Sequence, residues 1–184
     1  PTNSNPVSET AMTQTTPNLA EINKAQLVPL RAAMYDFSEA GVRAALAAIS
    51  SPDAMFHACH PFGDLQGANA FYDGLYAPLF SAVPDLERRD YIVAAGPTAE
   101  GANWVGCAGF YTGRFLAPWL DIPPTGHLMH MRFHEFYRFD DGQLVDVQCL
   151  WDLPEVIIQA NVWPLSPSLG REWLLPCPAT QAGL

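Results

Sequence analysis

The sequence predicts an α+β domain in which three N-terminal helices pack on a curved antiparallel β-sheet. Two observations carry this prediction. Between Glu21 and Ile49, apolar residues recur at three- and four-residue steps, the period of an amphipathic helix. From Leu86 to Trp151, runs of aromatic and β-branched residues alternate with Gly, Pro and Asp, which is typical of strands joined by turns. Helices and a sheet of this kind each have an apolar side to bury, so we expect the helices to cover one sheet face.

Individual elements follow from local signals. Ser38 precedes Glu39 and the helix-weakening Gly41, so we expect it to cap a second helix within the first apolar stretch. The later predicted elements are a strand at 55–60, a helix at 67–82, strands at 86–94, 103–115, 129–139 and 143–151, and a helical turn within 152–159. Residues 61–63 and the proline-rich segment 116–126 are predicted as loops.

The chain length fits one domain with tails. Residues 1–20 are rich in Thr, Ser, Asn, Gln and Pro and are expected to be disordered, with Met12 as a candidate native start. We assign 21–162 to the folded domain. Residues 163–184 contain Trp163, Trp173 and several prolines, and we expect an irregular extension that packs on the domain or on a dimer partner.

Composition excludes several function classes. The net charge of -10, with only 9 Lys and Arg, argues against a nucleic-acid or membrane-surface partner. No apolar run approaches the ~20 residues of a membrane span, and no secretory signal is visible, so we expect a cytoplasmic protein. The four cysteines and five histidines lack metal-site spacings, and neither a nucleophile elbow nor a glycine-rich phosphate loop occurs. We therefore expect no metal and no cofactor.

The segment from Met131 to Trp151 carries the strongest hairpin signal, because Asp140-Asp141-Gly142 separates two strand-like runs. Alternation places Phe133, Glu135 and Tyr137 on one face, which reads as interior. The other face receives Arg132, His134, Phe136 and Arg138. A carboxyl between two buried aromatic rings loses hydration, which raises its pKa, so Glu135 is predicted to be a protonated hydrogen-bond donor or proton carrier. The alternative is an ion pair with an arginine across the sheet.

Four other side chains are candidates for the site. His60 stands at the predicted end of the first strand and is our candidate general base, the alternative being a histidine bonded to loop backbone. His57, three residues earlier, falls on the opposite strand face. Tyr111 is a candidate phenol donor to a developing enolate, unless it serves only in packing, and Tyr35 on the first helix is a weaker candidate for the same role.

Several motifs together resemble the SnoaL-like polyketide cyclases of the NTF2-like superfamily, over residues 21–162. The motifs are Gly113-Arg-Phe115, Asp121-Ile-Pro-Pro-Thr-Gly126, Phe136-Tyr-Arg-Phe-Asp-Asp-Gly142-Gln-Leu-Val-Asp146 and Leu150-Trp-Asp152. The resemblance implies a conical NTF2-like fold with a pocket, and commonly a homodimer. It does not specify a substrate.

Ketosteroid isomerases of the same superfamily use a general base at the end of the first strand and a hairpin carboxylic acid in the oxyanion hole. By resemblance, the base position falls on His60, the acid position on Glu135 and the aromatic residue that closes the pocket on Trp151. One position departs from the cyclases, because the aspartate that acts as their acid and base aligns with Cys149. Proton transfer would then fall to Glu135 and a histidine.

We therefore expect a cofactor-independent cyclase, isomerase or dehydratase that removes a proton next to a carbonyl of a hydrophobic, polyketide- or steroid-like molecule. His60, Glu135 and Tyr111 are the expected catalytic residues. The expected substrate-binding residues are Trp151, Phe133, Tyr137, Cys149, His57 and Tyr35. The alternative is a non-catalytic NTF2-like domain that binds a small molecule.

Overall fold

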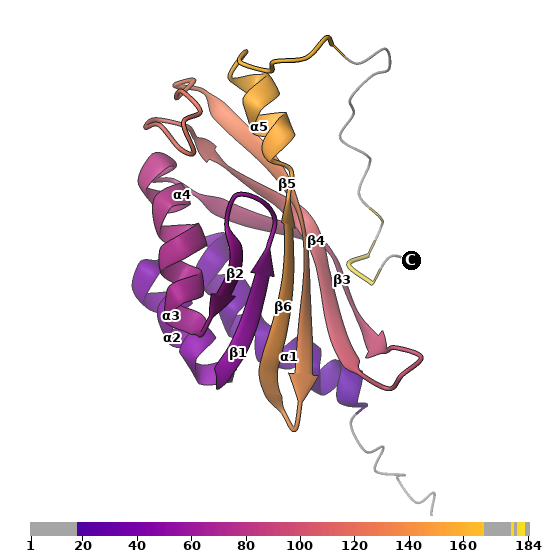
Figure 1. Ribbon diagram of the computed structural model, residues 1–184. Coiled ribbons are helices and arrows are strands. Elements are labelled where there is room, and N and C mark those ends of the chain that lie inside the picture. Colours follow the sequence, from indigo (N-terminus) through magenta and orange to yellow (C-terminus); the bar gives the residue numbers. More distant parts are fainter. Residues whose placement is uncertain (1–17, 168–177, 179, 183–184) are drawn as a thin grey trace, which may run out of the picture.

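The computed structural model describes residues 18–167, 178 and 180–182 (Figure 1). The predicted disordered segment 1–20 falls almost entirely outside the described residues, as does Trp173 of the C-terminal extension. The first described helix begins at Leu19.

The described part of the chain begins with two helices. α1 (Leu19–Tyr35) and α2 (Glu39–Ile49) are separated at Ser38, as predicted, and the Ser38 hydroxyl accepts a hydrogen bond from the Gly41 amide at 3.3 Å. The predicted helix at 67–82 is one continuous helical stretch with a π-helical turn in its middle: α3 (Ala68–Phe71), η1 (Tyr72–Tyr76) and α4 (Ala77–Ala82). A short C-terminal helix, α5 (Leu153–Gln159), is capped by the side chain of Asp152, which accepts from the Glu155 amide at 3.2 Å.

Six strands of the described residues form one sheet in the order β2-β1-β6-β5-β4-β3. The strands are β1 (Ser50–Ala58), β2 (Gly63–Gln66), β3 (Glu87–Pro97), β4 (Asn103–Arg114), β5 (Leu128–Asp140) and β6 (Gln143–Trp151). Neighbours pair antiparallel except β1 and β6, which are parallel. The α+β class and the helix-on-sheet arrangement are confirmed.

Two strand predictions need correction. β2 lies partly in a segment predicted as a loop; it is only four residues long and lacks an apolar alternation, so its pairing with β1 supplies the order. β1 starts earlier and ends earlier than predicted, at Ala58. His60 therefore lies in the turn after the strand rather than at the strand end.

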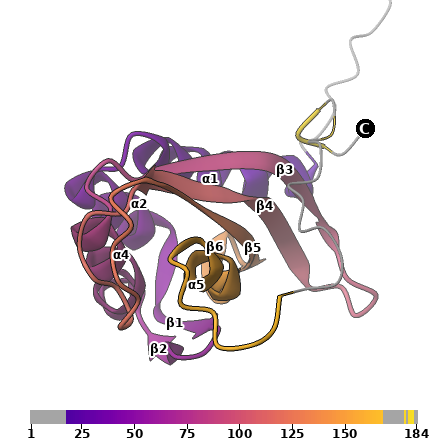
Figure 2. The same ribbon diagram turned by 90° about the horizontal axis from the view of Figure 1, so that it is seen from above.

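The helices α1 to α4 cover one face of the sheet, which curves around them (Figures 1 and 2). This inner face carries the core: on β5, the buried side chains are those of every second residue from Met129 to Phe139. The opposite face, which we call the outer face, is left uncovered by these helices, and Leu128, Phe136 and Leu150 on it are 57%, 46% and 60% exposed. α5 lies where β6 ends, at the top of Figure 1.

The β3 edge of the sheet is irregular. The register between β3 and β4 shifts between Asp90 and Ile92. Next to this shift, the carbonyl oxygen of Gln181 accepts a hydrogen bond from the Val93 amide at 2.6 Å. A described residue of the C-terminal extension thus contacts the β3 edge. None of the described helices is long and apolar enough to cross a membrane.

Candidate active site

A fully buried carboxyl group occupies the centre of the inner face. Glu135 on β5 is 0% exposed, between the buried side chains of Phe133 and Tyr137. These three residues share the interior face of β5, as the alternation in the sequence predicted. The opposite set, including His134 and Phe136, faces outward.

The partner of Glu135 is Arg88, a buried residue of β3 on the far side of β4. Its guanidinium donates to a carboxylate oxygen of Glu135 and, from Nε, to Asp90 at 3.1 Å. The same guanidinium carbon lies 4.1 Å above the centre of the Phe133 ring, a cation–π contact. Arg88 therefore neutralises the carboxylate inside the core. Of the two possibilities considered from the sequence, the structure shows the ion pair between Glu135 and an arginine across the sheet.

Three further donors surround the Glu135 carboxylate. The Tyr137 hydroxyl donates at 2.6 Å, the Tyr111 hydroxyl at 3.0 Å and the Trp151 indole N–H at 2.9 Å. Burial alone would raise the pKa of Glu135, but the charge of Arg88 and these hydrogen bonds lower it below its ordinary value. The prediction of a protonated Glu135 is therefore wrong: the group is a carboxylate, and it accepts hydrogen bonds rather than donating one.

A second tyrosine extends the network toward the helices. The hydroxyls of Tyr76, in η1, and Tyr111, in β4, lie 3.3 Å apart, and Arg88 Nη1 donates to the Tyr111 oxygen at 3.0 Å. Burial raises the pKa of both phenols well above the ordinary value, with a smaller contribution from the Glu135 charge. Both tyrosines are therefore neutral donors at physiological pH. Tyr111 is committed to Glu135, whereas the Tyr76 hydroxyl contacts only Tyr111 among the described hydrogen bonds.

Aromatic rings close this network from solvent. The Trp151 ring lies 5.3 Å from that of Tyr111 and 5.6 Å from that of Tyr76, measured between ring centres. Beyond it stand Phe62, at 5.6 Å from Trp151, and Trp119, at 6.3 Å. Trp119 is buried, and its indole N–H has no acceptor among the residues that the structure describes.

The remaining predicted site residues are dispersed. Cys149 is buried on β6 opposite Glu135, and burial, followed by the Glu135 charge, raises its pKa well above the ordinary value. His60 is exposed in the turn between β1 and β2, two residues from Phe62. His57 lies on the outer face, where its Nδ1 is 2.8 Å from Asp64. Tyr35 is 52% exposed on α1, and its hydroxyl accepts from Arg89 at 2.9 Å.

Sequence reasoning missed Arg88 and Tyr76. The signal for Arg88 was present, because alternation from the buried Leu86 places residue 88 on the inner face, but nothing in the local pattern pairs it with a hairpin 47 residues away. Tyr76 lies in the predicted third helix, where its ring reads as ordinary core. Its hydroxyl becomes informative only when β4 brings Tyr111 next to it.

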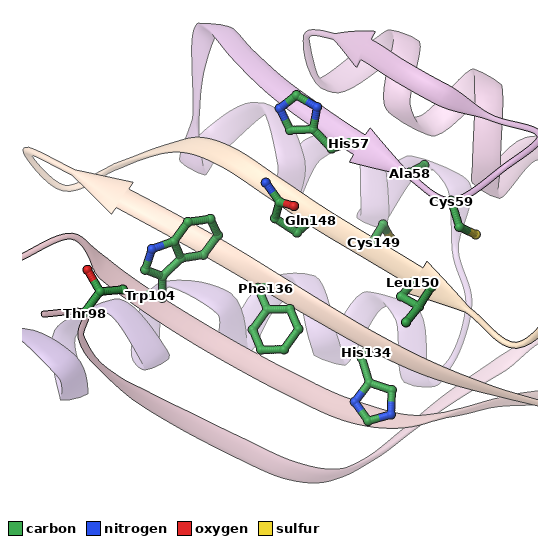
Figure 3. Close-up of a pocket in the computed structure, with 10 residues that line it drawn as sticks. All are labelled: His57, Ala58, Cys59, Thr98, Trp104, His134, Phe136, Gln148, Cys149 and Leu150. Carbon is green, nitrogen blue, oxygen red and sulfur yellow. The ribbon is translucent and has the colours of Figure 1, made fainter. Parts of the chain in front are cut away.

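The outer face holds an open hollow of about 730 Å³ (Figure 3). Figure 3 shows His57 and Cys59 on or next to β1, Gln148 and Leu150 on β6, and Phe136 and His134 on β5. This hollow lies on the opposite sheet face from Glu135. Among the described residues, no group of three or more His, Cys, Asp or Glu side chains is arranged to hold a metal ion.

The family model described as SnoaL-like polyketide cyclase matches residues 29–160. This match begins within α1, continues through the end of α5 and contains every residue of the Glu135 network. The comparison with curated proteins gave no match.

Solved structures share the fold at low sequence identity. AclR from Streptomyces galilaeus has a TM-score of 0.65 at 18% identity, covering 82% of this chain and 91% of its own. A protein from Jannaschia sp. CCS1, named as SnoaL-like polyketide cyclase, has a TM-score of 0.64 at 20% identity, covering 83% and 99%. IdmH from Streptomyces antibioticus has a TM-score of 0.61 at 18% identity, covering 76% and 99%. These similarities establish the fold.

Proposed function

Because the chain belongs to the SnoaL-like polyketide cyclase family, we propose that it is a cofactor-independent enzyme acting on a hydrophobic, carbonyl-containing molecule of polyketide type. The proposed step is removal of a proton from the carbon next to the carbonyl. The C–H bond breaks, its electron pair forms the enolate C=C bond, and the negative charge develops on the carbonyl oxygen. Ring closure, isomerisation or dehydration can each follow from that enolate.

The observation that carries this proposal is the buried chain Tyr76–Tyr111–Glu135. The Tyr111 hydroxyl donates its single hydrogen to Glu135 and accepts a hydrogen bond from Arg88, so its position is fixed. The Tyr76 hydrogen can turn from Tyr111 to a ligand oxygen without breaking any contact to Glu135. A neutral phenol in a dry aromatic environment is a strong donor to a developing enolate oxygen.

In this proposal Glu135 is a positioning residue. Its carboxylate orients Tyr111, Tyr137 and the Trp151 indole, and it would be a poor base because Arg88 and those donors stabilise its ionised form. Trp151, with Phe133 behind Tyr111, supplies apolar contact area for the substrate rings. Tyr137 and Cys149 complete the wall around the carboxylate.

The proton acceptor in this proposal is His60. The turn that carries it also carries Phe62, whose ring contacts Trp151 and Trp119 at the solvent side of the aromatic cluster. An imidazole at that rim can receive a proton from a substrate carbon and release it to water. His57 and Tyr35 are removed from the proposal, since the first lies on the outer face and the second on the exposed side of α1.

The test is a screen of polycyclic and poly-β-carbonyl compounds for turnover, followed by Tyr76→Phe on the substrate found. We expect kcat to fall about 100-fold with little change in KM, the usual effect of removing one donor to a developing oxyanion. Tyr72→Phe is the matched control: Tyr72 is equally buried in the same π-helical turn, and its hydroxyl has no described partner. Equal turnover by the Tyr76→Phe and Tyr72→Phe enzymes would refute the role of Tyr76.

His60→Ala tests the base separately. We expect kcat to fall by about 100-fold, and we expect the plot of kcat against pH to lose the limb that a general base contributes. The control is His127→Ala, which replaces another exposed histidine, directly after the loop segment 116–126. If kcat of His60→Ala depends on pH as the wild-type kcat does, His60 is not the base.

A second function, non-catalytic binding of an apolar molecule, is favoured by one specific observation. The Glu135 carboxylate is fully engaged by protein donors, and Cys149 stands where the resemblance to the cyclases expects an acid and base. A ligand that binds at micromolar concentration, survives incubation unchanged and is unaffected by His60→Ala would support this function over the enzymatic one.

A further inference from the structure

A hydrogen-bond donor without a partner lies in the aromatic cluster beside the Glu135 network. Trp119 is 3% exposed, and its buried indole N–H has no acceptor in the part of the chain that the structure describes. A buried indole usually has one, and that of Trp151 donates to Glu135 at 2.9 Å. An unpaired buried donor costs free energy, and an acceptor oxygen of a bound molecule would remove that cost.

The turn that carries Trp119 holds the indole in this position. Trp119 and Ile122 exchange two backbone hydrogen bonds, of 3.2 and 2.8 Å, around Leu120 and Asp121. The φ angles of Leu120 and Asp121 are 50° and 61°, in the left-handed region that glycine usually occupies in two-residue turns. Leucine adopts this conformation at a cost, so the buried side chains of Trp119 and Ile122 must hold the turn. Backbone strain that packing maintains in this way is concentrated at active sites and ligand sites.

Trp119 shares a neighbour with Tyr76, the proposed donor to the enolate oxygen. The centre of the Trp151 ring lies 6.3 Å from that of Trp119 and 5.6 Å from that of Tyr76. The Phe62 ring lies 6.2 Å from that of Trp119, so rings from two other segments of the chain surround the indole. An aromatic ligand that packs on Trp151 would therefore lie next to both Tyr76 and Trp119.

The two donors define the chemistry of the ligand. The Tyr76 phenol and the Trp119 indole are neutral, and the nearby cation, Arg88, is already engaged by Glu135 and Asp90. An uncharged acceptor such as a carbonyl oxygen suits this environment better than a carboxylate, which would need a counter-ion when buried. Because each donor has one hydrogen, two acceptor oxygens are needed to satisfy both.

We infer that Trp119 is a specificity-determining residue, whose indole N–H donates to a second, unreactive oxygen of the substrate while Tyr76 donates to the carbonyl oxygen that becomes the enolate. The substrate class is a flat, uncharged molecule with two acceptor oxygens. The inference rests on the proposed function, because it places the ligand in the aromatic cluster on the inner face. Such a site rejects an analogue that lacks the second oxygen, since the buried indole then stays unpaired.

The test uses two diketones, para-diacetylbenzene and the longer para,para′-diacetylbiphenyl, which place their carbonyl oxygens at different separations. In the matched monoketones, a CH₂ group replaces one carbonyl. Each compound is titrated into the isotope-labelled full chain, and the indole N–H signals of its five tryptophans, assigned through the backbone, are followed by NMR. We expect one diketone to move the Trp119 proton signal to higher frequency, as a new hydrogen bond does, and its monoketone to leave that signal nearly unchanged.

Trp119→Phe removes the N–H and keeps an aromatic ring. We expect the dissociation constant of the diketone to rise about 10-fold, the effect of losing one hydrogen bond between neutral groups. That of the monoketone should stay within about twofold, because its one carbonyl takes the Tyr76 phenol, the stronger donor. The matched control is Trp104→Phe, which changes a half-buried tryptophan of the outer face (Figure 3) and should leave both constants within about twofold. Circular dichroism establishes folding, and if Trp119→Phe does not fold, the wild-type signal decides alone.

Several results would overturn the inference. They are a Trp119 signal that neither diketone moves, equal shifts with diketone and monoketone, equal diketone affinities of the wild type and Trp119→Phe, and an equal loss of affinity in Trp104→Phe. The last would place the probe in the outer hollow.

The same probes test the proposed function separately in heavy water. Removal of a proton next to the carbonyl and return of a deuteron to that carbon make the methyl proton signal of the acetyl group fade. A shifted Trp119 signal without this exchange supports the inference and contradicts the enolate step. Exchange without the shift supports the enolate step and overturns the inference.

Discussion

Arg88→Met is the substitution that most sharply tests the buried network. It removes the guanidinium that neutralises Glu135, while the flexible methionine fills much of the same apolar space beside Phe133 and Met34. Breaking a fully buried ion pair by removing one partner typically costs about 3–5 kcal/mol, because the remaining charge has lost its counter-ion. Natural domains have about 5–15 kcal/mol in total, so we expect a folded but much weakened protein.

A double-mutant cycle separates the pair from the surrounding packing. Glu135→Gln alone leaves Arg88 buried without its main counter-charge and should also destabilise by about 3 kcal/mol. In Arg88→Met/Glu135→Gln no charge is left unpaired, so the loss should fall short of the sum of the single losses by at least ~2 kcal/mol. Arg89→Met is the control: that neighbouring arginine is 43% exposed and pairs at the surface with Glu87, so we expect less than about 1 kcal/mol.

The pH dependence of the unfolding free energy is a second test. The contribution of Glu135 to this free energy should change with pH in opposite directions in the wild type and in Arg88→Met. In the wild type, the pKa of Glu135 is lowered in the folded state. Its stabilisation is therefore present above the unfolded pKa near 4.5 and is lost as the pH falls through the folded pKa. Without Arg88, burial becomes the dominant influence and raises the folded pKa above the unfolded one. The contribution of Glu135 is then greatest at low pH and is lost as the pH rises through the folded pKa.

Urea unfolding followed by circular dichroism between about pH 3.5 and 7 measures both effects. Two outcomes would refute this interpretation of the network. In the first, the loss of unfolding free energy in the double variant equals the sum of the losses in the two single variants. In the second, after the pH dependence of Glu135→Gln is subtracted, the unfolding free energies of the wild type and of Arg88→Met change with pH in the same direction.

Three further predictions concern single sites. Iodoacetamide should alkylate the half-buried Cys59 of the native protein well before Cys149, whose pKa burial raises far above its ordinary value; peptide mass spectrometry would detect the opposite order. Gly109→Ala should lower the unfolding free energy by more than about 3 kcal/mol, because the added Cβ would lie 2.1 Å from a backbone oxygen of β3. The control is Gly96→Ala, whose Cβ meets no atom within 4 Å, and it should change the unfolding free energy by less than about 1 kcal/mol. Similar melting temperatures of the two variants would contradict the close packing at the β3–β4 register shift. Ser38→Ala removes the α2 N-cap and should lower the unfolding free energy by about 1 kcal/mol in urea titrations, with no loss indicating that the cap bond contributes nothing.

The sequence was most informative where a period of two or 3.6 residues decides which side is buried. The hairpin parity placed Glu135 inside, and the helix pattern with Ser38 between α1 and α2 gave the covering layer. The same information could not give the charge state of Glu135. That state depends on Arg88, which reaches the hairpin only because β4 lies between β3 and β5, a pairing that no local pattern reveals.

His60 shows the other limit of sequence reasoning. Its expected position at a strand end rested on a boundary two residues too late, and boundaries depend on hydrogen bonds to neighbouring strands rather than on local preference. The edge strand β2, which contributes Asp64 opposite His57, was missed for the same reason. The first error moved His60 out of the strand, whereas His57 and the aromatic and acidic residues of the hairpin lie on the strand faces where the alternation put them.

The Arg88–Glu135 pair also determines how the strands of this sheet can be aligned. If β3 slipped by one residue along β4, Arg88 would turn to the outer face and the Glu135 carboxylate would remain in the core without a counter-charge. Such an alignment is less stable by several kcal/mol, so the pair discriminates against every odd-numbered misalignment of the edge strand. Replacing Arg88 with an apolar residue should remove this discrimination, and amide hydrogen exchange confined to β3 should then become faster than in the Arg89→Met control. The chemistry at the centre of the inner face and the correct assembly of the sheet thus depend on the same guanidinium.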